Sequence, residues 1–160
     1  MAPPGRPLTQ GEWGSIHPGL ALALQQSGAS PSVVPRAHPA ARVAALWRGS
    51  IPVLTRGDAI FWPGAPADLS QSGLERRMAV LQHELQHVLD YRTGRLSGLS
   101  YLSRPHNWRY EWAGSEDLDW ERLGAEQRAS MAGRLWLVDR GLAPASEGAF
   151  LTARIPWARS

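Results

Sequence analysis

The segment Leu81-Gln-His-Glu-Leu-Gln-His-Val-Leu89 is the clearest structural signal in this chain of 160 residues. Leucine and valine residues recur in and around it at helical spacing. Upstream, Ser72-Gly-Leu-Glu75 matches a capping box, and downstream Gly94 stands where a glycine commonly ends a helix. The pattern predicts a helix over about residues 73–93.

Two histidines, His83 and His87, lie four residues apart on this predicted helix. Side chains at that spacing share one face, and two neutral imidazoles there can bind one tetrahedral cation such as zinc. Glu84 follows the first histidine about 100° round the helix, where it can reach an attacking water without binding the metal. This is the H-E-x-x-H arrangement, in which the glutamate acts as general base. Incidental histidines are the alternative, but the flanking apolar residues favour a metal site.

A catalytic zinc site needs a third protein ligand and keeps one position open. The chain has no cysteine, so this ligand must be His, Asp or Glu. We expect Glu126, near the start of a second predicted helix over about residues 122–140, where small neighbours would let the two helices approach closely. A solvated helix carboxylate is the alternative for this residue. His106 is the runner-up ligand, and the rival acids are Glu111, Glu116, Asp117, Asp119 and Glu121.

Asp90 lies on the same predicted helix face as the two histidines. It is expected either to orient a ligand imidazole or to pair with Arg92 or Arg95. Three tyrosines are candidate hydrogen-bond donors to an oxyanion, with simple packing as the alternative: Tyr91, Tyr101 and Tyr110.

The rest of the chain predicts an α+β domain dominated by helices. Two short extended stretches around a turn are expected within residues 51–62. Thr9-Gln-Gly-Glu12 matches another capping box. Residues 27–42 are expected to be loop, residues 94–118 a long ordered loop, and the tail from residue 142 irregular.

Length and composition indicate one globular domain. Hydrophobic residues make up 43% and charged residues 19%, which excludes a disordered chain. Residues 1–7 are predicted to be a flexible lead, and residues 8–160 a single domain. No apolar run approaches the roughly 20 residues that span a bilayer, and no secretory signal is recognisable. We therefore expect no membrane partner and a cytoplasmic location, with export by a dedicated machine left open.

The formal net charge is +3, and the basic residues are all arginine. They are scattered along the chain instead of forming a basic stripe. No nucleic-acid partner is therefore expected.

Three motifs in order carry a resemblance to a known family. The segment 81–89 resembles the metal-binding helix of zincin-type metallopeptidases. With Thr55-Arg-Gly-Asp-Ala-Ile-Phe61 before it and Leu123-Gly-Ala-Glu-Gln-Arg-Ala129 after it, the chain is similar to small bacterial zincin-like domains described as Vgr-related. Those domains accompany contractile secretion or phage-like systems. The last motif departs from their usual Glu-Gln-Gln-Ala, since it has arginine in place of the second glutamine.

The resemblance implies a gluzincin-like zinc metallopeptidase that cleaves peptide bonds in a peptide or protein substrate. It implies Glu84 as general base and a zinc ion held by His83, His87 and Glu126. It also implies that Ala59 to Trp62 is a strand edging the cleft, where an extended peptide could add as a β-strand. The alternative is a non-catalytic zinc-binding adaptor or structural domain of a secretion or phage-like particle. A weaker alternative is an amidase acting on peptidoglycan stem peptides.

Overall fold

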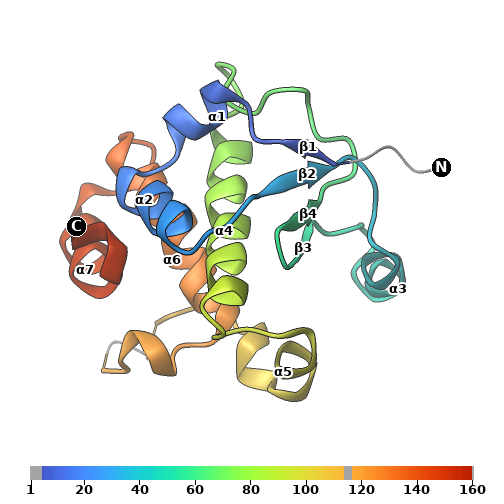
Figure 1. The fold of residues 1–160 in the computed structure, drawn as a ribbon. Coiled ribbons are helices and arrows are strands. Elements are labelled where there is room, and N and C mark those ends of the chain that lie inside the picture. The colour runs from blue at the N-terminus through green and yellow to red at the C-terminus, as the bar shows by residue number, and fades with distance from the viewer. Residues whose placement is uncertain (1–4, 114–116, 160) are drawn as a thin grey trace.

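Helix α4 (Glu75–Arg92) runs through the centre of the molecule, and the other elements lie around it (Figure 1). Its predicted span is confirmed to within about two residues. The predicted Ser72 cap is wrong: Gly73 has a φ of +85°, no side chain caps the helix, and the Glu75 carboxylate instead accepts the Gly73 N–H at 3.0 Å. The predicted stop is confirmed, because Gly94 adopts the left-handed conformation with a φ of +74°.

The computed structural model describes residues 5–113 and 117–159. The other α-helices of this part are α1 (Gln10–Ser15), α2 (Pro18–Gln26), α3 (Pro39–Arg48), α5 (Gly98–Ser103), α6 (Ala125–Asp139) and α7 (Gly148–Arg154). Short 3-10 turns are η1 (Pro105–Trp108), η2 (Trp120–Arg122), η3 (Ala145–Glu147) and η4 (Pro156–Arg159). The predicted α+β, helix-dominated architecture is thus confirmed.

Four short strands form one sheet in the order β1-β2-β4-β3: β1 (Arg6–Pro7), β2 (Ser32–Val34), β3 (Leu54–Arg56) and β4 (Ala59–Phe61). Strands β3 and β4 form the expected antiparallel hairpin, with Thr55 opposite Ile60. Strand β4 also pairs in parallel with β2, so both of its edges are occupied. The strand at the edge of the sheet beside α4 is therefore β3, and the expectation that Ala59 to Trp62 edges the cleft is wrong.

The core lies where α4 meets the sheet on one side and the other long helices elsewhere. In Figure 1 the sheet and helices α2 and α7 lie on opposite sides of α4, while α6 packs along its length. The α4 side chains Leu81, Leu85 and Val88 are fully buried in a core that also contains Leu20 and Ile60. Burying one such side chain stabilises the fold by about 1.5–3 kcal/mol, which fixes the rotation of α4 about its axis.

Several segments that were expected to be irregular contain regular structure. Helix α5 and turn η1 lie within residues 94–118, and α7 and η4 lie in the tail, where they pack against α6 and α2. Strand β2 and the start of α3 lie within residues 27–42. Arg6 and Pro7 pair with β2, so the expected flexible lead is wrong for these two residues, and residues 1–4 lie outside the described part.

The other helix boundaries follow from their caps. Helix α1 has the predicted Thr9–Glu12 capping box, in which each side chain accepts the backbone N–H of the other residue. Helix α6 begins at Ala125 instead of about residue 122, because a 3-10 turn precedes it. In the described part of the chain, none of the helices has the length and hydropathy needed to cross a membrane.

Candidate metal centre

Helix α4 presents two imidazoles on one face. The rings of His83 and His87 lie 4.9 Å apart between centroids and are tilted by 81° to each other. His87 is only 5% exposed, whereas His83 is half-buried at the lip of a cleft. The predicted pairing of these two histidines is therefore present in the structure.

Helix α6 brings Glu126 to the same point. Its Oε2 lies 3.0 Å from Nε2 of His83 and 3.4 Å from Nε2 of His87, and the residue is 4% exposed. Small residues permit this approach: a Cβ added to Gly133 of α6 would lie 2.8 Å from the carbonyl oxygen of Ala79 on α4. The close packing of α4 and α6 thus places Glu126 beside both histidines. The small residue at this contact is Gly133, whereas Gly124, next to Glu126, lies against the His106 backbone of η1.

These three side chains fit a zinc ion. One ligand atom from each lies within 4.8 Å of the others, and the set comprises two imidazole nitrogens and a carboxylate oxygen. In a tetrahedral site with bonds of about 2.0–2.2 Å, neighbouring donor atoms lie about 3.3–3.6 Å apart. The measured separations of 3.0 and 3.4 Å are close to that spacing.

The rival ligands do not join this group. His106 is exposed in η1, its carbonyl group lies against Gly124 just before α6, and it is not part of the candidate ligand cluster. Glu121 pairs with Arg95 at the surface, and the other described rival acids are exposed, namely Glu111, Asp117 and Asp119. Glu116 lies outside the described residues. Within the described part, the candidate ligand set therefore consists of three residues.

The electrostatics of the cluster favour a positive charge between its side chains. Burial alone would lower the pKa of His87, but the hydrogen bond and charge of Glu126, with the charges of Glu84 and Asp90, raise it to about 9. Burial would raise the pKa of the Glu126 carboxyl, but the two histidines hold it far below its usual range. A metal ion would need neutral imidazoles, so it would take the place of a proton here.

Two tyrosines from the segment after α4 flank the ligands. The hydroxyl of Tyr101 on α5 donates a hydrogen bond to Oε1 of Glu126 at 2.7 Å. This contact occupies one carboxylate oxygen and leaves Oε2 facing the histidines. The ring of Tyr110 stacks on His83, with centroids 6.1 Å apart and planes 17° apart. Tyr101 therefore orients the candidate metal ligand Glu126, which differs from the oxyanion role considered from the sequence. The third tyrosine, Tyr91, is half-buried on α4.

Glu84 lies beside the ligands but makes a different contact. Its Oε2 accepts a hydrogen bond from the Thr55 hydroxyl of β3 at 2.7 Å, and the residue is 5% exposed. Its Oε1 has no hydrogen-bond partner among the described residues. One oxygen is thus fixed by the edge strand, and the other is available to accept a proton.

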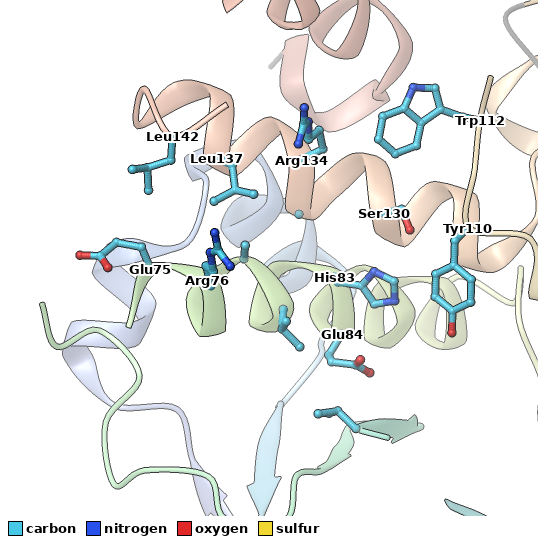
Figure 2. Close-up of a pocket in the computed structure, with 14 residues that line it drawn as sticks. Glu75, Arg76, His83, Glu84, Tyr110, Trp112, Ser130, Arg134, Leu137 and Leu142 are labelled. Carbon is cyan, nitrogen blue, oxygen red and sulfur yellow. The ribbon is translucent and has the colours of Figure 1, made fainter. Parts of the chain in front are cut away.

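His83 and Glu84 line one end of a cleft of about 880 Å³ between α4 and α6. Figure 2 shows Glu84 directed toward the sheet, with His83 and Tyr110 next to each other at the same end. Val53, just before β3, also lines this cleft. The cleft is therefore bordered by His83 and Glu84, whereas His87 and Glu126 are buried behind it.

Asp90 has neither of its expected partners. Its carboxylate accepts hydrogen bonds from Arg128 of α6 and Gln86 of α4, both at 2.9 Å. Its expected partners are engaged elsewhere: Arg92 pairs with Asp58, and Arg95 pairs with an exposed glutamate. Nδ1 of His87 has no hydrogen-bond partner in the described part of the chain, so Asp90 does not orient this imidazole by a hydrogen bond.

Sequence reasoning missed three residues that support the site. The sequence indicates Thr55 only as part of a motif, Tyr101 only as one of three candidate oxyanion donors, and Arg128 only as a departure from the usual motif. Each contacts a residue at least 25 positions away in the chain, so no local pattern could have identified its partner. No protein-family model, curated protein or solved structure matches this chain, so the geometry described above carries the functional argument.

Proposed function

We propose that this chain is a zinc-dependent hydrolase that cleaves peptide bonds. Its ligands are His83, His87 and Glu126, and Glu84 is the general base. One observation carries the proposal: three candidate ligand side chains from two helices converge, and one of them, His83, lines an open cleft together with Glu84. The sequence resemblance to gluzincin-type metallopeptidases agrees with this arrangement.

The residues have separate tasks in this reaction. When bound, zinc polarises the scissile carbonyl and lowers the pKa of a water molecule toward about 7. Oε1 of Glu84 takes the proton of the attacking water and then passes it to the leaving amine. Thr55 holds Oε2 of Glu84, so the carboxylate keeps its direction while its charge changes. Tyr101 keeps Glu126 turned toward the histidines.

The free edge of β3 suits an extended peptide. A peptide that adds to an exposed sheet edge gains main-chain hydrogen bonds without needing a particular sequence. Val53 before β3 lines the cleft, and Thr55 within β3 contacts Glu84. A peptide along this edge would therefore pass the general base, which favours a peptide over a compact small molecule as substrate.

Two measurements on the purified protein test the proposal. Wild type should hold about one zinc ion per chain by elemental analysis, and His83→Ala should lose it. Glu84→Gln should retain zinc but cleave a peptide mixture at least about 100-fold more slowly, as followed by mass spectrometry. Glu111→Gln is a matched control, because this exposed glutamate stands outside the ligand group.

The outcomes separate the two functions considered from the sequence. A wild type that binds no metal, or a Glu84→Gln variant as active as wild type, would contradict the proposal. Zinc binding without cleavage of any peptide would instead favour the non-catalytic zinc-binding domain. That function predicts a closed site with four protein ligands, whereas the described cluster has three and borders a cleft.

A further inference from the structure

The end of the cleft away from the metal ligands carries a guanidinium group. Arg76 lies two helix turns before His83 on the same face of α4, about 10.5 Å away along the helix axis. Figure 2 shows Glu75 and Arg76 at one end of the cleft, and His83 and Glu84 at the other. The cleft therefore connects the candidate catalytic centre to a distant cation.

Arg76 differs from the other charged residues at this end because its charge is uncompensated. Arg134 donates two hydrogen bonds of 2.6 Å to the carboxylate of Glu147. Glu75 accepts the backbone N–H of Gly73 at the start of α4. Arg76 is exposed and has no hydrogen bond or ion pair within residues 5–113 and 117–159. Its guanidinium is thus available to a carboxylate, whose two oxygens match the arginine fork.

Apolar side chains line part of the cleft: Val80 of α4 and, on the α6 side, Leu137 and Leu142, of which Leu142 is 53% exposed. Figure 2 shows Leu137 and Leu142 near Arg76, whereas Arg134, which pairs with Glu147, lies nearer to His83. The helices approach each other closely at Gly133, which has no side chain and lies next to the carbonyl oxygen of Ala79. Exposed apolar side chains inside a cleft suit the apolar side chains of a ligand.

The direction of β3 indicates which end of a peptide would reach Arg76. Thr55 of β3 contacts Glu84, and Asp58 in the turn after β3 pairs with Arg92 at the C-terminal end of α4. Strand β3 therefore runs along α4 toward its C-terminal end and away from Arg76. Antiparallel pairing is slightly more stable than parallel pairing. A peptide bound antiparallel to β3 therefore places its C-terminal part toward Arg76. An extended chain spans about 3.3–3.6 Å per residue, so about three residues cover the 10.5 Å.

We propose that Arg76 binds a substrate carboxylate about three residues C-terminal to the scissile bond, with apolar residues in between. The carboxylate is either an acidic side chain or the C-terminus of the peptide, because both present the same group. This inference rests on the proposed peptidase function and names the substrate class of that site.

Binding to the zinc-loaded Glu84→Gln variant tests the proposal without turnover. Calorimetry would compare acetyl-Ala-Ala-Ala-Leu-Leu-Glu amide, the same peptide with Gln in place of Glu, and that Gln peptide with a free C-terminus. We expect either carboxylate peptide to bind about threefold to tenfold more tightly than the neutral one, as fits a partly exposed ion pair. Preference for the Glu amide identifies a side-chain carboxylate, and preference for the free acid identifies a chain end.

Two further substitutions in the Glu84→Gln background assign the effect to one residue. Adding Arg76→Gln should abolish the preference, and adding Arg77→Gln should retain it, because Arg77 is exposed but does not line the cleft. Equal binding of the three peptides, absence of binding, or a preference that survives Arg76→Gln would overturn the inference. If wild type cleaved peptides without any carboxylate preference, the hydrolase proposal would hold and the role of Arg76 would be refuted. If the carboxylate preference depended on Arg76 but wild type cleaved no peptide, carboxylate recognition would hold and the hydrolase proposal would be refuted.

Discussion

Replacing Asp90 by asparagine tests the buried polar network that joins α4, α6 and the C-terminal turn. Asp90 is fully buried and accepts hydrogen bonds from Arg128 and Gln86, both at 2.9 Å. Gln86 in turn accepts the indole N–H of Trp157 at 2.8 Å. Because Trp157 fixes the orientation of the Gln86 amide, its NH₂ group must face Asp90. The network therefore requires an acceptor at both oxygens of residue 90.

Asp90→Asn removes one acceptor and the only formal negative charge that Arg128 contacts among the described residues. Arg128 is 3% exposed and cannot deprotonate, so its charge would remain buried without a counter-ion. The new amide would also direct a donor at either Arg128 or Gln86. Breaking a buried pair in this way costs about 3–5 kcal/mol. That is a large part of the roughly 5–15 kcal/mol that stabilises a typical domain.

Urea unfolding followed by tryptophan fluorescence would measure this loss in the free energy of unfolding. Glu121→Gln is the matched control, because it breaks the exposed pair with Arg95 and should cost less than about 1 kcal/mol. The double variant Asp90→Leu with Arg128→Met should recover most of the loss, since it leaves no unpaired charge. If Asp90→Asn cost no more than Glu121→Gln, the argument from buried charge would be refuted.

Three further predictions concern the metal ligands and the fold. Tyr101→Phe should weaken zinc binding about 10- to 100-fold in a chelator competition, because it removes a hydrogen bond to a ligand carboxylate, and Tyr91→Phe should not. Gly133→Ala should lower the free energy of unfolding, measured in urea, by about 1–3 kcal/mol, because the new Cβ would meet the backbone of α4. Gly98→Ala is the control, since a Cβ there meets nothing within 4 Å, and an equal loss in both variants would contradict the argument. Burial alone would raise the pKa of the Glu12 carboxyl, but a salt bridge to arginine and two backbone N–H groups lower it. The charged Glu12 therefore stabilises the folded state fully above pH about 4.3, the pKa of an unfolded glutamate. This stabilisation is lost as the pH falls through the lowered pKa of the folded state. The difference in unfolding free energy between wild type and Glu12→Gln should therefore shrink as the solution is acidified below pH about 4.3, and a constant difference would argue against a charged Glu12.

Local sequence signals were sufficient for the long helices and the histidine pair. Helix α4 combines regular leucine spacing with a glycine that adopts a positive φ at Gly94, and both signals act within a few residues. The predicted Ser72 cap failed because Gly73 also adopts a positive φ, which turns the chain away from the geometry of a capping box. A pattern of residue types indicates that a helix is near, but the backbone conformation of one glycine decides where it begins.

The missed helices lack the pattern that identified α4. Leu99 and Leu102 of α5 are 80% and 69% exposed, so its apolar residues do not mark a buried face. Its capping box has Ser100 where Glu or Gln is usual. Helix α7 begins with Gly148, a poor helix former, and is held by packing against α6. Tertiary contacts, which are not visible in local sequence, therefore determine both segments.

The hairpin was predictable, but its place in the sheet was not. Two short apolar stretches on either side of Arg56-Gly57-Asp58 indicate two paired strands, and this pattern does not say which strand is the outer one. Pairing of Val33 with Ile60 decides this point, because it makes β4 an inner strand and β3 the edge. The contact crosses a long stretch of chain, so only the folded structure reveals which strand borders the cleft.

This topology divides the candidate site into two parts with different supports. The candidate metal ligands depend on the packing of α4 against α6, where Gly133 lies close to the backbone of α4. The proposed general base Glu84 belongs to α4 as well, but its carboxylate is held by a hydrogen bond from Thr55 on the edge strand. A peptide that pairs with β3 would therefore contact the element that orients the base, while the ligands on the two helices stay in place. A substitution at Thr55 should therefore change the orientation of Glu84 without changing metal binding, because the two depend on different contacts of the same helix.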